Sequence, residues 1–156
     1  YGTAFVKNSY VGRTFIKPKQ SSRESAVRIK LNVLKEAVAG RRIIMIDDSI
    51  VRGTTSALIV NMLRDAGARE VHVRISAPPF LHPCYFGTDI PSEDQLIAHG
   101  HTVGEIRDMI GADSLSYLKM ERLQEMACSR SICTACFSGK YPIEPPVEDI
   151  RGSYDK

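Results

Sequence analysis

One stretch, an apolar run followed by two aspartates, constrains the fold more than any other. The four consecutive apolar residues Ile43 to Ile46, three of them β-branched, predict a strand buried on both faces, which is typical of a central strand in a parallel sheet. Asp47 and Asp48 end this run, and a loop of small and hydroxyl-bearing residues around Gly53 follows. Residues 54–66 then carry apolar side chains at helical spacing. The stretch therefore predicts a strand, a loop and a helix of an α/β protein.

The loop after the aspartates has the features of an anion site. In open α/β sheets, ligands bind at the carboxyl ends of the strands, where free N–H groups at helix N-termini attract anions. Gly53 would let the backbone approach a phosphate closely, and the hydroxyl groups of Ser49, Thr54 and Thr55 are further donors. The loop contains one glycine and no Gly-Lys-Ser/Thr, so it is neither a Walker A motif nor a G-x-G-x-x-G fingerprint.

The two aspartates indicate what else such a site binds. Beside a phosphate, the carboxylates of Asp47 and Asp48 need hydroxyl donors or a cation between them and the anion, because like charges repel. A sugar phosphate whose ribose hydroxyls bond to the acids, with Mg²⁺ nearby, satisfies all of these groups. The simpler interpretation is a generic strand, loop and helix in which one of the acids caps the helix.

The string IDDSIVRGTTS, residues 46–56, resembles the phosphoribosyl pyrophosphate motif of type I phosphoribosyltransferases. It is similar to the version found in the glutamine phosphoribosylpyrophosphate amidotransferase family. The resemblance implies an α/β fold in which helices flank a mostly parallel sheet. It also implies that Asp47 and Asp48 contact the ribose hydroxyls and Mg²⁺, and that the following residues hold the 5′-phosphate. Those residues are Ser49, Ile50, Val51, Arg52, Gly53, Thr54 and Thr55.

Basic residues are concentrated in the first part of the chain. Residues 1–42 hold ten Lys and Arg against two acidic residues, whereas the net charge of the whole chain is only +3. This asymmetry indicates an anionic partner. A nucleic acid is disfavoured, because the basic residues are not interleaved with aromatic side chains and no nucleic-acid-binding motif appears. A polyphosphate substrate explains the same charge.

Residues 7–16, KNSYVGRTFI, combine cations, a glycine and a tyrosine, which suits a mobile lid over an anion. They resemble the KNxYVGRTFI segment of the amidotransferase family. The resemblance implies that Lys7, Tyr10 and Arg13 contact the pyrophosphate. The alternative interpretation is a solvated basic loop.

The rest of the chain predicts further strands and helices of one domain. Gly67 is expected to end the helix at residues 54–66, and His72 is expected to face away from the valines of its strand. We interpret residues 1–127 as a partial phosphoribosyltransferase domain and residues 128–156 as a cysteine-containing segment and tail packed on it. We expect strands at 3–6, 29–33, 71–75 and 114–118, and helices at 21–27, 91–98, 103–110 and 120–127.

Four cysteines in a chain without a recognisable signal peptide indicate a reducing, cytoplasmic location and a metal or redox role. Cys133 and Cys136 have the C-x-x-C spacing at which two thiolates chelate one metal centre. A redox dithiol shares this spacing, although the pair does not sit at the start of a helix that follows a predicted strand. Zinc binding and ordinary thiols are the other interpretations.

The string CxxCxxGKYPIE, from Cys133 to Glu144, resembles the C-terminal segment of amidotransferases that carry a [4Fe–4S] cluster. The resemblance implies that Cys84, in a PCxxG loop, is the third cluster ligand and that the fourth ligand precedes this chain. Cys128 then has no role in the cluster.

The family resemblance implies transfer of the phosphoribosyl group of phosphoribosyl pyrophosphate to ammonia, which gives 5-phosphoribosylamine in the first step of purine synthesis. The ammonia would come from glutamine through an upstream glutaminase domain. The implied cofactors are Mg²⁺ and a [4Fe–4S] cluster, and the further partners are nucleotide feedback inhibitors and other copies in a homo-oligomer, with no nucleic acid or membrane. We expect the chain to be truncated at its N-terminal side, which would leave strands unpaired and one sheet face uncovered.

Three alternative functions share part of the pattern. A nucleobase phosphoribosyltransferase would share the Asp-Asp loop, would not need the cysteines, and should carry a base-stacking aromatic residue after a later strand. A non-catalytic regulator that senses phosphoribosyl pyrophosphate would also keep the loop. An iron–sulfur protein without transferase activity would leave Asp47 and Asp48 unexplained.

Overall fold

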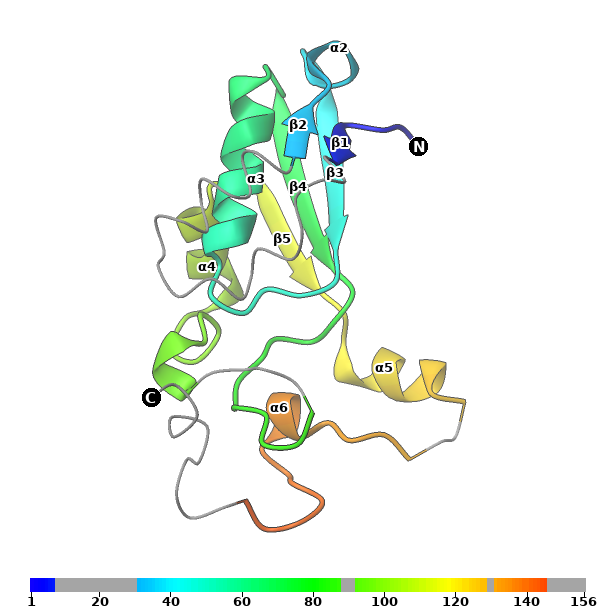
Figure 1. Cartoon of the computed structure of the whole chain (residues 1–156), viewed down its shortest axis with the longest axis vertical. Coiled ribbons are helices and arrows are strands. Elements are labelled where there is room, and N and C mark those ends of the chain that lie inside the picture. Colours follow the sequence, from blue (N-terminus) through cyan, green and yellow to red (C-terminus); the bar gives the residue numbers. More distant parts are fainter. Residues whose placement is uncertain (8–30, 88–91, 129–130, 146–156) are drawn as a thin grey trace.

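Three parallel strands form the centre of the computed structural model, which describes residues 1–7, 31–87, 92–128 and 131–145 (Figure 1). The strands are β3 (Arg42–Asp47), β4 (Glu70–Ile75) and β5 (Ser114–Tyr117), and they lie in that order. Asp47 pairs with Ile75, and Ile75 pairs with Tyr117. The carboxyl ends of the strands therefore meet at one edge, and the predicted parallel α/β architecture is confirmed.

Helices α3 (Thr54–Asp65) and α4 (Val103–Ile110) contact each other and cover one face of this sheet (Figure 1). Alternate residues of β4 and β5 point toward the helices, because successive side chains of a strand point to opposite faces. The buried core combines both layers and contains Val60, Leu63, Val71, Val73, Ile75, Ile106, Ile110 and Leu115. Its apolar residues recur at helical spacing in the helices and at every second position in the strands.

Local sequence signals set the ends of both helices. After α3, Gly67 adopts a left-handed φ of 92°, and the N–H of Ala68 donates to the carbonyl of Leu63 at 3.0 Å. This geometry is a Schellman motif and confirms the role predicted for Gly67. Before α4, the side chain of Thr102 accepts from the backbone of Glu105, and the Glu105 carboxylate accepts from the backbone of Thr102. This capping box fixes where α4 begins.

The face of the sheet opposite these helices is open in the described part of the chain. Ile44 and Ile46 are 66% and 75% exposed. The prediction that this strand is buried on both faces is therefore wrong for the described structure. The reason is that β3 is an edge strand with β4 on one side, and no described element packs over these two side chains.

A row of polar side chains continues this open face across β4 and β5. The Nδ1 atom of His72 lies 2.9 Å from Ser114 Oγ, and its Nε2 atom lies 3.1 Å from a carboxylate oxygen of Glu70. Arg74 donates to the same Ser114 hydroxyl at 2.9 Å. His72 therefore faces away from the valines, as expected, and the open face is apolar along β3 but polar along β4 and β5.

The remaining elements are short. Two strands form a separate antiparallel pair, and two of the short helices, α2 and α6, were not predicted. None of the helices in the described ranges has the length and hydropathy needed to cross a membrane. The predicted helix at 21–27 lies outside the described residues. The elements are β1 (Phe5–Lys7), β2 (Leu31–Val33), α2 (Lys35–Val38), the 3₁₀ turn η1 (Glu93–Gln95), α5 (Met120–Met126) and α6 (Ala135–Ser138).

The predicted helix at 91–98 is reduced to the single turn η1, so this prediction is wrong in length. The chain becomes extended at Leu96, with φ −87° and ψ 112°. The N–H of Ile97 then donates to the carbonyl of Val51, 2.9 Å away, instead of continuing a helix. A tertiary hydrogen bond thus replaces the local one.

Asp113 joins both helices to the sheet. Its Oδ2 atom accepts from the backbone N–H of Val71 at 2.5 Å and from the guanidinium of Arg64 at 2.6 Å. These partners lower the pKa of Asp113, and the hydrogen bond from Val71 has the largest effect. Because the pKa in the folded state lies below the unfolded value of 3.8, the stabilising contribution is complete above that value. It is lost as the pH falls through the folded pKa.

We expect Asp113→Asn to lower the melting temperature at pH 7 by roughly 2–4 °C, because it removes a charged acceptor from two donors. The difference from the wild type should shrink below pH 3.8, where protonation removes the same charge. Melting curves from pH 2.5 to 7 measure both effects. Asp108→Asn, which changes an exposed carboxylate paired with the neighbouring Arg107, is the matched control. Equal melting temperatures of Asp113→Asn and the wild type at pH 7 would contradict the stabilising role of the Asp113 carboxylate.

Candidate functional site

The loop of residues 48–53, here called the β3–α3 loop, connects the carboxyl end of β3 to the N-terminus of α3 (Figure 1). The first backbone N–H that bonds within α3 is that of Ala57, which donates to the carbonyl of Gly53 at 2.9 Å. The N–H groups of Thr54, Thr55 and Ser56 precede it and have no acceptor within the helix. The first turn contains no acidic residue, and Gly53 offers no capping side chain. The positive end of α3 is therefore suited to an anion.

Asp47 and Asp48 lie at the start of this loop. Asp47 Oδ1 accepts from the backbone N–H of Asp48 at 2.9 Å, and Asp48 Oδ1 accepts from the hydroxyl of Ser49 at 2.8 Å. Burial raises the pKa of Asp47, the hydrogen bond from Asp48 opposes this, and the negative charge of Asp48 raises the pKa further. Ionised Asp47 therefore costs free energy that a cation or a hydroxyl donor would offset. This observation fits both Mg²⁺ and ribose hydroxyls.

The other predicted phosphate-binding residues differ in what they can offer. Ile50 is only 2% exposed and packs in the core, so its side chain cannot reach a ligand. The carbonyl of Val51 is occupied by a hydrogen bond from outside the loop. Arg52 and Thr54 are exposed, and Thr55 is half-buried. The guanidinium of Arg52, the hydroxyl groups of Thr54 and Thr55 and the backbone N–H groups are therefore the donors that remain.

Gly53 is required for reasons that the sequence did not reveal. Its φ is 79°, in the left-handed region that favours glycine. A Cβ atom at this position would lie 2.5 Å from Ile97 Cδ1. The close approach of a phosphate to Gly53 stays a prediction, and the structure adds that the absent side chain makes room for Ile97. The apolar run of residues 96–98 was the only signal in the sequence for a buried residue here, and it was assigned to the helix that was incorrectly predicted at 91–98.

The lid predicted at residues 7–16 is described only at its first residue. Lys7 ends β1 and is exposed. Tyr10 and Arg13 lie outside the described residues, so their predicted contacts with pyrophosphate remain predictions.

Three of the four cysteines gather where the loop after β4 meets α6. The N–H groups of Leu81 and His82 both donate to the carbonyl of Cys136, at 2.9 and 3.0 Å. Burial raises the pKa of Cys136 to about 11, and the nearby thiols of Cys84 and Cys133 make smaller contributions in the same direction. Thiolates at these positions would repel one another, and a metal centre would offset that repulsion.

The C-x-x-C segment is also held by aromatic contacts. The rings of Phe80 and Phe137 lie 4.8 Å apart, and the hydroxyl of Tyr141 donates to the carbonyl of Pro83 at 2.8 Å. Cys128 lies beyond α5, is exposed, and has its thiol 3.6 Å from the carbonyl of Met126. Among the described residues, no group of three or more His, Cys, Asp or Glu side chains is arranged so that it could hold a metal ion. Cys84, Cys133 and Cys136 are near enough to influence one another, but they do not form a metal site in the described structure.

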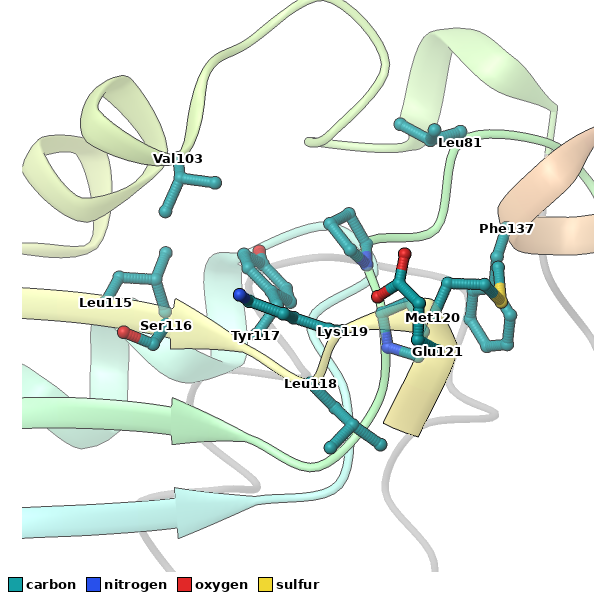
Figure 2. A pocket seen from close by; sticks show the side chains of 12 residues that line it. Leu81, Val103, Leu115, Ser116, Tyr117, Leu118, Lys119, Met120, Glu121 and Phe137 are labelled. Atoms are coloured by element: carbon teal, nitrogen blue, oxygen red, sulfur yellow. The ribbon is translucent and has the colours of Figure 1, made fainter. Parts of the chain in front are cut away.

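A groove of about 850 Å³ lies at the carboxyl end of β5 (Figure 2). Tyr117, the last residue of β5, lines it, and its buried hydroxyl has no hydrogen-bond partner among the described residues. Burial raises the pKa of Tyr117 to about 12. Lys119 and Glu121 also line the groove (Figure 2). An aromatic residue after a later strand is the feature that a nucleobase phosphoribosyltransferase would need.

Comparisons with known proteins agree with the motif. No family model matches the chain. The chain is 54% identical to the amidophosphoribosyltransferase of Archaeoglobus fulgidus, 57% to that of Synechococcus elongatus and 53% to that of Bacillus subtilis. These alignments cover 97%, 97% and 92% of this chain but 34%, 31% and 32% of the relatives. The chain therefore spans about a third of their length.

The fold is also similar to that of solved structures of these enzymes. A solved structure of the glutamine phosphoribosylpyrophosphate amidotransferase of B. subtilis, complexed with ADP and GMP, superposes with a TM-score of 0.79 at 51% identity. It covers 95% of this chain and 34% of that one. A structure described as the allosteric regulatory enzyme of purine biosynthesis gives the same TM-score and identity. Identity at this level over nearly the whole chain, on the same fold, means that the chain corresponds to a region of amidophosphoribosyltransferases that makes up about a third of their length.

Proposed function

We propose that this chain is the phosphoribosyl pyrophosphate-binding part of an enzyme that transfers the phosphoribosyl group to ammonia derived from glutamine. The product is 5-phosphoribosylamine, the first intermediate of purine synthesis. One observation carries the proposal: Asp47 and Asp48 lie at the start of the loop that leads to the uncapped, acid-free N-terminus of α3. This edge offers acceptors for sugar hydroxyls and donors for a phosphate within a few residues of each other.

The chemistry requires stabilisation of two opposite charges. As the bond at C1 of the ribose breaks, positive charge develops on the sugar and negative charge on the departing pyrophosphate. Asp47 and Asp48 accept hydrogen bonds from the ribose hydroxyls and lie near the developing positive charge. The N–H groups at the start of α3 hold the 5′-phosphate. Ammonia attacks C1 directly, so no side chain of this chain acts as a nucleophile.

The pyrophosphate needs positive partners. When bound, Mg²⁺ neutralises charge on the pyrophosphate, and Asp47 and Asp48 are the residues of this chain that would contact it. The raised pKa of Asp47 supports this role, because a nearby cation offsets the cost of its ionisation. Lys7, with Tyr10 and Arg13 of the same segment, is assigned to the pyrophosphate.

Cys84, Cys133 and Cys136 are assigned to a [4Fe–4S] cluster whose fourth thiolate lies outside this chain. The gathered thiols and the packing of the C-x-x-C segment against the loop after β4 support the assignment. The cluster would tie the segment after α5 back to the sheet and stabilise it structurally. Cys128, which is not among the thiols that influence Cys136, has no part in it.

The same proposal includes the partners of the whole enzyme. These are a glutaminase domain that supplies ammonia, further copies in a homo-oligomer, and nucleotides as feedback inhibitors, in a cytoplasmic protein. The complex of the B. subtilis relative with ADP and GMP supports nucleotides as a class of ligand.

The test uses the full-length protein that contains this chain. Calorimetry should detect binding of phosphoribosyl pyrophosphate in the presence of Mg²⁺, and an assay that offers ammonia or purine bases should detect transfer to ammonia alone. Transfer to a base would instead favour a nucleobase phosphoribosyltransferase, for which Tyr117 at the end of β5 is the supporting observation. Binding without turnover on either acceptor would favour a regulator.

A further inference from the structure

We propose that Ile97 is a positioning residue that holds the β3–α3 loop in the conformation in which it binds the 5′-phosphate. The proposal rests on the function proposed above. Ile97 lies 49 residues beyond Asp48 in the sequence, outside the motif that carries the family resemblance. Its role follows from contacts with two residues of the loop.

The first contact is a backbone hydrogen bond. The N–H of Ile97 donates to the carbonyl of Val51 at 2.9 Å, so a segment distant in sequence is tied to the middle of the loop. This bond fixes the direction of the Val51 peptide. The two residues that follow, Arg52 and Gly53, lead directly into the free N–H groups of α3.

The second contact is steric. Ile97 is 8% exposed, and its Cδ1 atom occupies the place beside Gly53 where any larger residue would put its Cβ atom. The Cγ2 atom of Ile110, in α4, lies 3.8 Å from the same point. Gly53 is buried under these side chains while its φ is 79°. Packing from outside the loop therefore supports a backbone conformation that is costly for most residues.

The segment that carries Ile97 is itself anchored. Glu93 lies 2.9 Å from His82 Nδ1 and 3.6 Å from His99 Nε2, and His99 Nδ1 lies 3.1 Å from the carbonyl of Leu81. Nδ1 of His101 lies 2.9 Å from the carbonyl of Ile97. Ile97 therefore packs against the β3–α3 loop from a segment that has its own hydrogen bonds and ion pairs before and after Ile97. Its position does not depend on the loop alone.

The experiment adds a methyl group at Gly53 and removes one from Ile97 in the full-length enzyme. Gly53→Ala places a Cβ atom 2.5 Å from Ile97 Cδ1, and we expect affinity for phosphoribosyl pyrophosphate to fall by roughly a hundredfold. Ile97→Val removes Cδ1 and should weaken affinity only about threefold. The double variant should recover roughly tenfold over Gly53→Ala, because the clash is relieved while the left-handed backbone strain remains.

Two controls separate positioning from stability. Ile106→Val removes the same methyl group from a core isoleucine of α4 that is 1% exposed, and Gly40→Ala adds a methyl group at a φ of 71° with no atom within 4 Å. Both should lower the melting temperature and leave affinity unchanged. The dissociation constant, the KM, the kcat at saturating substrate and the melting temperature are measured for every variant. The effect of Ile97→Val should appear in KM and not in kcat.

The outcomes distinguish this inference from the proposed function. If the wild type binds no phosphoribosyl pyrophosphate, the proposed function fails and the role of Ile97 fails with it. If the wild type binds but the double variant is no better than Gly53→Ala, only the role of Ile97 is overturned. The role of Ile97 would also be overturned if Ile97→Val and Ile106→Val lost affinity in the same proportion to their losses of melting temperature.

Discussion

Replacing Asp47 and Asp48 together by asparagine in the full-length enzyme is expected to lower phosphoribosylamine formation by about a thousandfold. Each carboxylate is proposed to accept a hydrogen bond from a ribose hydroxyl, and loss of a charge-assisted bond costs about 1.5–3 kcal/mol. Two such losses amount to roughly two to four orders of magnitude in kcat/KM. Hydrolysis of glutamine, which needs neither residue, should persist.

The substitution is nearly isosteric, so the folded structure should survive it. The side-chain oxygen of an asparagine at position 47 can still accept a hydrogen bond from the backbone N–H of residue 48. Asp108→Asn, which changes an exposed carboxylate of α4, is the control and should leave synthesis unchanged. Synthesis at the wild-type rate in the double variant would contradict the proposal that Asp47 and Asp48 bind the ribose hydroxyls.

Replacing Cys133 by serine should have the second large effect. We expect anaerobically purified full-length protein to be brown and to contain about four iron and four sulfide per chain. Cys133→Ser should remove the colour and open residues 131–145 to proteolysis, because the centre would no longer tie this segment to Cys84 across about fifty residues of chain. Absorption spectra, metal analysis and limited trypsin digestion measure these changes.

Cys128→Ser is the matched control, because Cys128 is exposed like Cys133 but lies outside the group formed by the other three thiols. It should change neither colour nor digestion. If this variant instead loses the cluster, four cysteines of the chain itself form the centre, and the expectation of a ligand from outside the chain is wrong.

The elements predicted correctly were those specified by short-range patterns. The apolar run before Asp47 predicted β3, helical spacing predicted α3, and Gly67 predicted the end of that helix. The capping pair at the start of α4 is equally local. In each case the residues that determine the structure lie within a turn or two of one another, so the sequence alone was sufficient.

The errors concern interactions between distant segments. The helix predicted at 91–98 stops because the N–H of Ile97 bonds to Val51, about 45 residues earlier. The role of Gly53 likewise depends on Ile97, which no pattern around the glycine reveals. The gathering of Cys84 and Cys136 was available only through the family resemblance, because spacing along a chain does not determine proximity in space.

The open side of β3 has a consequence for the chain as a separate molecule. Ile44 and Ile46 project from a strand whose outer edge has no partner in the described part of the structure. Unpaired backbone groups beside exposed β-branched side chains can bind the equivalent edge of a second copy and extend the sheet from one molecule to the next. We therefore expect the loss of soluble material to increase with protein concentration.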